Sequence, residues 1–452
     1  MAAFFSTPSN ALRAVSLSVL VVCAGPVWSM DLQQAYQAAL QQDATIRAAR
    51  AAADVGDERV EQAKAMRYPN VAFSAARNRN DLSNTQRNIL GRSVTVDENY
   101  TSHNATLTLR QPVYRKSLSV GLEQAHQMRA EVGAQLDREL QNLGVRVTDA
   151  YLQLLLAQDQ LALARAQKNT TTTQLDAARK LLVAGSGTRT DIDEAQVRLD
   201  MAVAQELEIR QQLDYARHQL ETLVNQPVAA LSPLDEAKFA AWTPEQRSVQ
   251  DWLALAEDNS PEIRQQKARL DVARLEIEKA RTGHLPTLDA VAQWTRSGSE
   301  NVTTPSSSYT NRVIGLQLNM PLFAGGYVSS TVRQAVAEQV QARELLEAAR
   351  RDLSLRIHTE FRGVSEGRLR IRALEQAARS ATQLVVSSRR SFEGGARTLV
   401  DILNAEQQKE LALRDLARAR YTYLVSCVRL QALAGGDRDS SIAAVNALLK
   451  TP

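Results

Sequence analysis

The chain of 452 residues contains the same pattern twice. Gly394–Gln408 reads GGARTLVDILNAEQQ and Gly185–Gln196 reads GSGTRTDIDEAQ, so that Asp401 stands 210 residues after Asp191. Two more segments recur in the same order at nearly the same spacing: Leu107–Tyr114 matches Leu316–Phe323, and Tyr68–Ala75 matches Leu285–Ala292. The sequence therefore predicts two copies of one structural unit of about 210 residues.

Each unit contains two stretches in which apolar and polar residues alternate, as in strands with one apolar face. These stretches are Val71–Ala75, Ala105–Leu109, Leu288–Trp294 and Ile314–Met320. The segments between them, Asn78–His103 and Ser297–Asn311, are rich in Asn, Ser and Thr, and we expect long polar hairpin loops there. Each unit thus contributes one β-hairpin, and the chain contributes four strands.

Helices are expected to form most of the remaining chain, because aromatic residues make up only 5% and there are just 19 glycines and 12 prolines. In each unit we expect three helices: an opening helix that stops before a proline, a very long helix with heptad spacing, and a shorter helix after the glycine-containing corner. The expected ranges are Asp31–Met66, Lys116–Val183 and Asp191–Val224, then Gln250–Thr282, Val328–Phe392 and Val400–Ala434. Each long helix would extend for roughly 100 Å and place its corner far from the strands.

The N-terminal residues have the layout of a secretory signal peptide, with an apolar run, Ala14–Ala24, that is too short to cross a bilayer. We expect cleavage near Ser29, and no acylation of Cys23 because the preceding Val22 is not small. The mature chain would keep one cysteine, Cys427, and so no internal disulfide. The predicted divisions are a signal peptide (1–29), a first repeat (30–224), an inter-repeat linker (225–249), a second repeat (250–434) and a C-terminal tail (435–452), with linker and tail forming an equatorial region outside the helices.

Charge and hydropathy restrict the class of protein further. The net charge is +4 and both signs are interleaved, which argues against nucleic-acid binding. No segment after the signal peptide reaches 18 apolar residues, so a transmembrane helix is not expected. Two hairpins leave open sheet edges, so several chains must combine. An exported chain with two-faced strands predicts an outer-membrane barrel, and three chains would supply twelve strands.

These features together resemble the TolC family of outer-membrane efflux proteins. The resemblance rests on the duplication, the strand ends QPVY and MPLF, the FAGGY turn at Phe323–Tyr327, and the GxRTxxDxxxA corner. It covers nearly all of the mature chain and favours the TolC and type I secretion branch over the acylated drug-efflux branch. It implies an α+β membrane protein whose long antiparallel coiled-coil helices and four transmembrane strands trimerise into a 12-stranded β-barrel and a 12-helix α-barrel.

The resemblance also implies a function and partners. The homotrimer would form a channel-tunnel in the outer membrane of a Gram-negative bacterium, surrounded by outer-membrane lipid, with its helical tunnel in the periplasm. An inner-membrane ABC or proton-driven transporter and a periplasmic adaptor (a membrane fusion protein) would dock at its closed inner end and open it. The cargo stays open between proteins, in type I secretion, and small molecules, in multidrug efflux.

Specific residues of the corners take roles through the resemblance. Arg397 is implied to bond to Asp191 of a neighbouring helix pair. The implied gate residues are Thr190, Asp191, Phe392 and Arg397, and the implied pore ring consists of Asp401 and Asn404. Two of these positions depart from the family, since Phe392 replaces a gate tyrosine and Asn404 replaces a second pore-ring aspartate.

Local chemistry gives the corners a second interpretation. Thr188 and Thr398 each precede an aspartate by three residues, which predicts a capping box at the start of each following helix. Arg397 stands before a helix start, where a cation opposes the helix dipole unless an acidic partner is near. The predicted strand-to-helix turns contain Pro112, Pro321, Gly325 and Gly326.

No pattern in the sequence indicates an enzyme, a metal site or a cofactor. The histidines, which are His103, His126, His218, His284 and His358, lie far apart without metal-ligand spacing. No phosphate-binding loop or nucleophile motif is present. Two alternatives are a soluble periplasmic coiled-coil adaptor or scaffold, which leaves the four strands unexplained, and a secreted helical enzyme, which lacks a candidate site.

Overall fold

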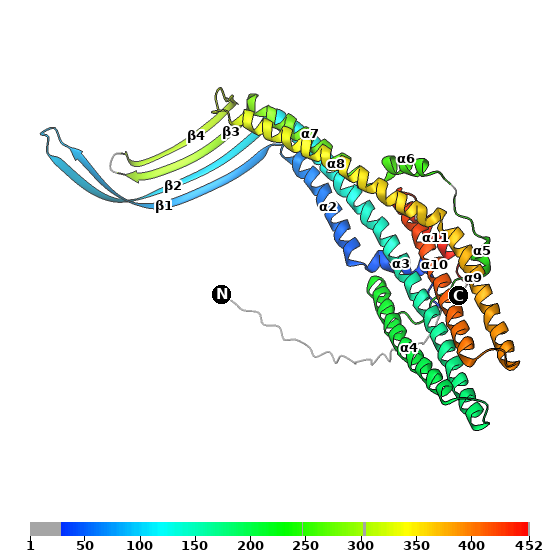
Figure 1. Ribbon diagram of the computed structural model, residues 1–452. Coiled ribbons are helices and arrows are strands. Elements are labelled where there is room, and N and C mark those ends of the chain that lie inside the picture. Colours follow the sequence, from blue (N-terminus) through cyan, green and yellow to red (C-terminus); the bar gives the residue numbers. More distant parts are fainter. Residues whose placement is uncertain (1–28, 246, 302–303, 451–452) are drawn as a thin grey trace, which may run out of the picture.

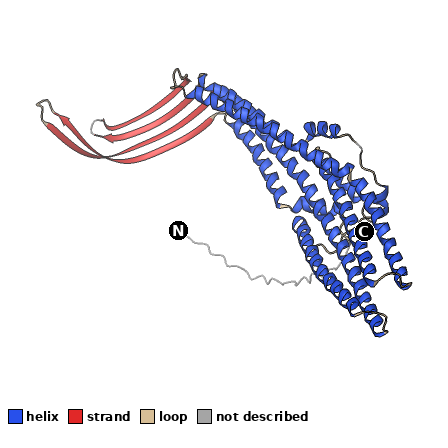
Figure 2. Ribbon diagram, viewed as in Figure 1, coloured by secondary structure: helices blue, strands red, loops and turns tan. Residues whose placement is uncertain are grey.

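The computed structural model describes residues 29–245, 247–301 and 304–450. The molecule is elongated, with a sheet at one end and helices that continue from it to the opposite end (Figure 1, Figure 2). The expected signal peptide, residues 1–29, lies outside the described residues apart from Ser29. Of the helices described, none is both long enough and apolar enough to cross a membrane.

The two halves of the chain contain corresponding elements in the same order. The first half consists of α1 (Leu32–Gln42), α2 (Ala44–Ala65), β1 (Asn70–Arg87), β2 (Ser93–Tyr114), α3 (Lys116–Val183), α4 (Arg189–Val224) and α5 (Glu236–Ala241). The second half consists of α6 (Val249–Asn259), α7 (Pro261–Arg281), a 3-10 turn (Thr282–His284), β3 (Thr287–Asn301), β4 (Thr304–Asn319), α8 (Tyr327–Ser365), α9 (Gly367–Glu393), α10 (Leu399–Leu433) and α11 (Arg438–Asn446). The duplication of the sequence thus extends to the order of the elements.

Each opening helix is broken, so the prediction of single helices over Asp31–Met66 and Gln250–Thr282 was wrong. Between α1 and α2, Asp43 leaves the helical conformation (φ −63°, ψ 122°), and its carboxylate caps α2 through a 3.0 Å bond from a backbone N–H three residues on. Ser260 adopts nearly the same angles (φ −57°, ψ 123°), because it precedes Pro261. The two breaks are 217 residues apart and therefore belong to the repeated unit.

The long helix of the second half is interrupted where that of the first half is not. α3 runs over Lys116–Val183 as predicted, whereas Glu366 separates α8 from α9 within the expected helix Val328–Phe392. The adjacent Gly367 lies against α10 so closely that a Cβ there would be 2.9 Å from Tyr423 Cδ2. Glycine therefore permits a close approach of α10 at the interruption.

The expected polar loops, Asn78–His103 and Ser297–Asn311, are mostly strand, so this prediction was also wrong. β1 and β2 pair without interruption up to the turn at residues 88–92. A ladder uses backbone groups, so polar side chains do not prevent pairing, and cross-strand hydroxyl pairs such as Thr85 and Thr95 (Oγ1–Oγ1 2.8 Å) support it. The turn between β3 and β4 includes residues 302–303, which lie outside the described residues.

The sheet is antiparallel in the order β1-β2-β3-β4, and its register places apolar residues of all four strands on one face. Paired residues form the rows Val71, Leu109, Ala292 and Ile314, and Phe73, Leu107 and Trp294. On the other face, the corresponding row is Ser74, Thr106, Thr295 and Asn311. The apolar face is open to its surroundings, since Phe73 is 67% exposed and Ile314 is 89% exposed.

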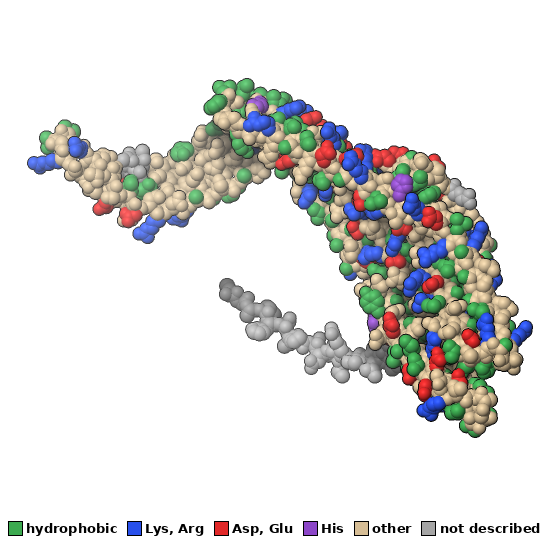
Figure 3. Space-filling view, viewed as in Figure 1, with side chains coloured by type: hydrophobic (Ala, Val, Ile, Leu, Met, Phe, Trp, Pro, Cys, Tyr) green, Lys and Arg blue, Asp and Glu red, His purple; other side chains and the backbone are tan. Residues whose placement is uncertain are grey.

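The helices pair into two hairpins at the end away from the sheet. α3 packs on α4, α9 packs on α10, and α10 also packs on α3 (Figure 1). Basic and acidic side chains are intermingled over the helices (Figure 3). This surface suits an aqueous environment, whereas the apolar face of the sheet does not.

The largest core lies halfway along the helices, around Tyr151 of α3. Its hydroxyl lies 3.0 Å from the carbonyl oxygens of both Met30 and Ser232, and so joins the first described residues to the linker between the halves. The C-terminal tail joins the same linker through a 2.9 Å bond from Lys450 N to Pro233 O. The linker and the tail thus fasten the two halves together.

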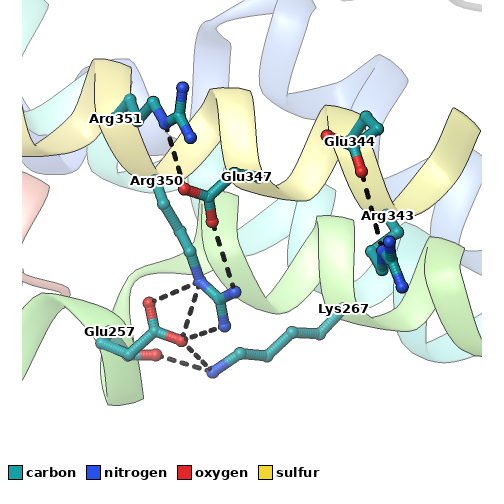
Figure 4. Close-up of polar contacts among 7 residues, drawn as sticks. All are labelled: Glu257, Lys267, Arg343, Glu344, Glu347, Arg350 and Arg351. Carbon is teal, nitrogen blue, oxygen red and sulfur yellow. Dashed lines mark hydrogen bonds and ion pairs between the residues drawn. The ribbon is translucent and has the colours of Figure 1, made fainter.

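A polar network on the flank fixes α6 against α7 and α8. Oε1 of Glu257 in α6 lies 2.7 Å from Nη2 of Arg350 in α8 and 2.9 Å from Nζ of Lys267 in α7 (Figure 4). Hydrogen bonds from Arg350 hold the pKa of Glu257 below its ordinary range, with a further contribution from Lys267. The ionised carboxylate therefore connects three helices at one point.

Candidate functional site

Both corners lie at the end of the molecule opposite to the sheet, where α3 meets α4 and where α9 meets α10 (Figure 1). Gly185 and Gly395 adopt left-handed backbone conformations, with φ of 78° and 75°. The backbone N–H of the following residue, Ser186 or Ala396, bonds to the carbonyl five residues earlier, at 3.0 Å and 2.8 Å. Both long helices therefore end in a Schellman turn, which favours glycine at the left-handed position.

A capping box begins the helix after each corner. The Thr188 hydroxyl accepts a bond from Asp191 N at 3.2 Å, and Asp191 Oδ2 accepts one from Thr188 N at 2.9 Å. Thr398 and Asp401 repeat this geometry at 3.4 Å and 2.9 Å. The backbone N–H and hydroxyl of Thr398 hold the pKa of Asp401 below its ordinary range. Capping uses only Oδ2 of each aspartate within the described chain, which leaves Oδ1 for a second partner.

The corners differ at the residue before the capping threonine. Gly187 N makes an additional 3.0 Å bond to Leu181 O, and a Cβ at Gly187 would lie only 2.9 Å from Leu182 N. The first corner therefore has no room for a side chain at this position. The second corner carries Arg397, whose Nη1 donates to the buried Ser388 Oγ at 2.7 Å.

The implied gate residues are not brought together within one chain. Thr190 is exposed, and the described residues contain no hydrogen bond or ion pair between Arg397 and Asp191. Arg397 bonds inside its own hairpin, and Asp191 bonds inside its own helix start. A pairing between neighbouring copies of the chain stays a prediction.

Phe392 belongs to an apolar cluster that joins the two corners. The other members of this cluster are Ala178 of α3, Ile192 of α4, and Leu399 and Leu403 of α10. The phenyl ring of Phe392 contributes contact area to this cluster and offers no hydrogen bond. The corners of one chain are therefore held against each other by apolar packing at their tips.

Arg198 is a residue of this region that the sequence analysis missed. It lies on α4 and donates to two side chains of α10: Nη2 to Asn404 Oδ1 at 2.9 Å, and Nη1 to Gln407 Oε1. A usable signal was present, because Arg198 stands one heptad after Asp191 and so shares its helix face. Its partners could not be read from the sequence, since the alignment of the two hairpins is a tertiary feature.

Two buried carboxylates were missed as well. Glu206 of α4 is 6% exposed and lies 2.8 Å from Lys168 Nζ of α3, and a hydrogen bond from Lys168 is the main cause that lowers the pKa of Glu206. Glu406 of α10 is 4% exposed and lies 3.1 Å from Arg389 Nη2 of α9. Each hairpin thus contains one buried acidic side chain paired with a cation of the opposite helix.

The four residues of the predicted strand-to-helix turns fall at two kinds of position. Pro321, Gly325 and Gly326 lie between β4 and α8, where both glycines are left-handed (φ 57° and 83°). Pro112 instead lies inside β2, at an irregularity of the ladder with β3, and the turn into α3 is the single residue Arg115. Proline lacks the N–H that a regular ladder would use, so it is placed where the pairing shifts.

The part of the chain that the structure describes contains no group of three or more His, Cys, Asp or Glu side chains able to hold a metal ion. Cys427 is buried beside Tyr423, and burial raises the pKa of its thiol to about 12. This thiol is therefore protonated and unreactive at neutral pH. The chemistry of the corners consists of capping, ion pairing and apolar contact.

A known protein family matches one segment in each half of the chain. The family described as "Outer membrane efflux protein" matches residues 35–226 and 252–436. The chain belongs to this outer membrane efflux protein family. The resemblance inferred from the strand ends and the corners is thereby confirmed.

Members of the family are similar to this chain over nearly its whole length. The proteases secretion protein PrtF of Dickeya chrysanthemi is 33% identical, over 94% of this chain and 92% of PrtF. The outer membrane protein TolC of Vibrio cholerae is 28% identical, over 94% of this chain and 95% of TolC. A crystal structure of CusC, described as forming a transmembrane channel, superposes with a TM-score of 0.76 at 17% identity, over 91% of this chain and 94% of that chain, which shows the shared fold.

Proposed function

We propose that this chain is one protomer of a homotrimeric channel-tunnel in the outer membrane of a Gram-negative bacterium. The sheets of three protomers form a closed barrel in the membrane, and their helices form a tunnel through the periplasm. An inner-membrane ABC or proton-driven transporter and a periplasmic adaptor complete the export path. The channel transports and does not catalyse.

The observation that carries this proposal is the exposed apolar face of the sheet. One apolar row, which begins at Val71, crosses all four strands, and the row of Phe73 crosses three before it ends at Arg312 of β4. The strands, with 15 to 22 residues, exceed the roughly 9–11 residues that a tilted transmembrane strand requires. Water would disfavour such a face, and lipid would favour it. The soluble adaptor alternative gives this face no partner.

The outer edges of the sheet support association between chains. β1 and β4 have no partner strand on their outer sides among the described residues, although they are 18 and 16 residues long. Open edges of this length are satisfied when β1 of one protomer pairs with β4 of the next, which closes the barrel. Three protomers supply twelve strands, an even number within the range of such barrels.

The cargo includes proteins, which the greater identity to PrtF, a proteases secretion protein, favours. The similarity to TolC, which belongs to a family described by efflux, supports small molecules as a second cargo. The same open pore serves both, because the transporter selects what enters it.

A matched pair of variants tests the assignment of the two faces. Phe73→Arg places a charge on the apolar face, where it costs about 2–4 kcal/mol at the middle of a bilayer, and Ser74→Arg places it on the polar face. We expect Ser74→Arg to enter the outer membrane as a detergent-stable trimer and Phe73→Arg to be lost from that fraction. Equal behaviour of both variants, or a soluble monomeric wild type, would overturn the proposal.

A further inference from the structure

The two hairpins of one chain are each more firmly joined internally than they are to each other. Within the hairpins, the buried carboxylates Glu206 and Glu406 pair with cations of the opposite helix. Each carboxylate also pairs within its own helix, with Arg210 at 2.9 Å or Lys409 at 3.5 Å, so separating the helices would break part of a charged network. It would also separate helices that pack along their length. Each hairpin is therefore expected to move as a unit.

α10 packs on α3, but the seam between the hairpins on the side of α4 is thin. α4 packs mainly on α3, and it meets α10 over only a short length. A cavity of about 230 Å³ lies between α3, α4 and α10, and Leu163, Ile209, Gln407 and Leu411 contribute to its walls. Gln160, Gln205, Glu410 and Arg414 also line this cavity, so its walls are largely polar. Side chains around the void lose the contacts that close packing would give. The hairpins thus meet at the apolar cluster of the tips and at few other places near the corners.

Arg198 spans this seam with a single guanidinium. It reaches from α4 to Asn404 and Gln407, which stand three residues apart and so share a face of α10. Gln407 also lines the cavity, so the bond lies at the boundary between the void and the corner. Among the described residues, the side-chain hydrogen bonds between α4 and α10 are the two that Arg198 donates.

We propose that Arg198 is a latch that holds the two hairpins of one protomer together and keeps the inner mouth of the channel closed. This inference rests on the proposed channel function and adds a residue to its gate. Arg198 releases Asn404 and Gln407 when the hairpin of α9 and α10 moves away. Because Arg198 places a positive charge beside Asn404, it also lowers the preference of the mouth for cations that Asp401 creates.

Single-channel conductance and reversal potential in planar bilayers test the latch. Arg198→Ala should raise the basal conductance about tenfold, which corresponds to about 1.4 kcal/mol in the opening equilibrium. It should also shift the reversal potential towards cation selectivity. Arg189→Ala is the matched control and should conduct like the wild type. Within the described chain, Arg189 forms its ion pair inside its own helix, with Asp193 at 3.3 Å.

Substitutions of Asn404 and Gln407 test whether Arg198 acts through these two residues. In an Asn404→Ala/Gln407→Ala background, Arg198→Ala should cause no further rise in conductance. Asn404→Asp should form a charged pair with Arg198 and lower the basal conductance below that of the wild type. Thermal stability of the trimer in detergent identifies any variant that is misfolded, and Arg198→Lys then serves as the milder test, with an intermediate rise expected.

The outcomes separate the latch from the channel itself. If the wild type and Arg397→Ser carry no current, the channel function fails, and the latch falls with it. If both conduct but Arg198→Ala matches the wild type in conductance and in selectivity, only the latch is overturned. A rise in conductance that persists undiminished in the doubly substituted background would also overturn the latch, because Arg198 would then act through other residues.

Discussion

The two corners of this chain have the same backbone and different chemistry. Both end a long helix in a left-handed glycine, and both begin the next helix with a threonine and an aspartate. They differ at the residue before the threonine, where Gly187 is packed against its own helix and Arg397 carries a cation. The two tips are thus equivalent in backbone, and one is compact at this position whereas the other carries a charged side chain.

This difference indicates how a repeated fold can carry an asymmetric function. The features that both corners share serve folding, since they satisfy the free backbone groups of four helix ends. The feature that they do not share contributes little to folding, because a cation before a helix start opposes the helix dipole. Because its one bond within the described chain is to Ser388, we propose that the charge of Arg397 serves the gate.

The largest functional effect is expected from Arg397→Ser, which removes this difference. A lost charge-assisted contact of about 1.5–3 kcal/mol would raise the open population, and hence basal conductance and sensitivity to large antibiotics, by tenfold or more. Arg390→Ser, on the same hairpin seven residues earlier, is the control of equal charge and should conduct like the wild type. Unchanged conductance in Arg397→Ser would leave the arginine without a role in the gate.

The opposite exchange, Gly187→Arg, should damage the first corner. A Cβ at this position would lie 2.9 Å from Leu182 N, so the corner must open and lose its additional backbone bond. We expect a loss of about 1–3 kcal/mol, measured by thermal unfolding of the detergent-purified trimer. The neighbouring Ser186→Arg is the control, and full stability of Gly187→Arg would refute the steric difference between the corners.

Removing the caps tests the equivalence of the corners. Thr188→Ala and Thr398→Ala should each lower the free energy of unfolding by about 1 kcal/mol, because each loses one hydroxyl that accepts a backbone N–H. Thr188→Ser and Thr398→Ser should restore most of this loss. Markedly unequal losses from the two alanine variants would show that the corners are not equivalent in folding.

The smallest expected effect is a dependence of the free energy of unfolding on pH, caused by one carboxyl group at the seam between the hairpins. Burial raises the pKa of Glu410, which lies beside the cavity, to about 7. The charges of Lys409 and Arg414 lower this pKa, and the charge of Glu406 raises it. The polar side chains that face it across the cavity from α3 and α4 are Gln160 and Gln205, which are uncharged. A carboxyl with a raised folded pKa keeps its proton when the unfolded chain has lost it, so stability should fall as pH rises from about 4.5 to 7.

This slope should be of the order of 1 kcal/mol, because Glu410 is partly exposed and solvent screens it. Glu410→Gln should remove it, and Glu393→Gln, on the exposed end of α9, should retain it. Thermal unfolding across that pH range measures both variants. A slope that survives in Glu410→Gln would assign the titration to another group.

The sequence predicted the parts of this fold that repeat and missed those that depend on pairing. The alternation around Phe73 and Leu107 gave the strands, and the heptad spacing gave α3, because both periods are set by one element alone. The hairpins were predicted too short, since Ser, Thr and Asn favour turns locally although the ladder does not exclude them. The break at Ser260 had a visible signal in Pro261.

The corners illustrate the same limit at the candidate site. Thr188 and Thr398 were read correctly as caps from their spacing to an aspartate, which is a contact within one turn. Arg198, Glu206 and Glu406 were missed, because each bonds to a helix whose alignment the sequence does not contain. The apolar setting of Phe392 likewise comes from three other helices.

The most direct test of the channel with a closed inner mouth is single-channel recording of the purified wild-type trimer in a planar bilayer. We predict a small, long-lived conductance that favours cations, because the proposed barrel is open and the proposed ring of Asp401 lines a closed mouth. Absence of any conductance, or a large constant conductance in the unmodified protein, would contradict it.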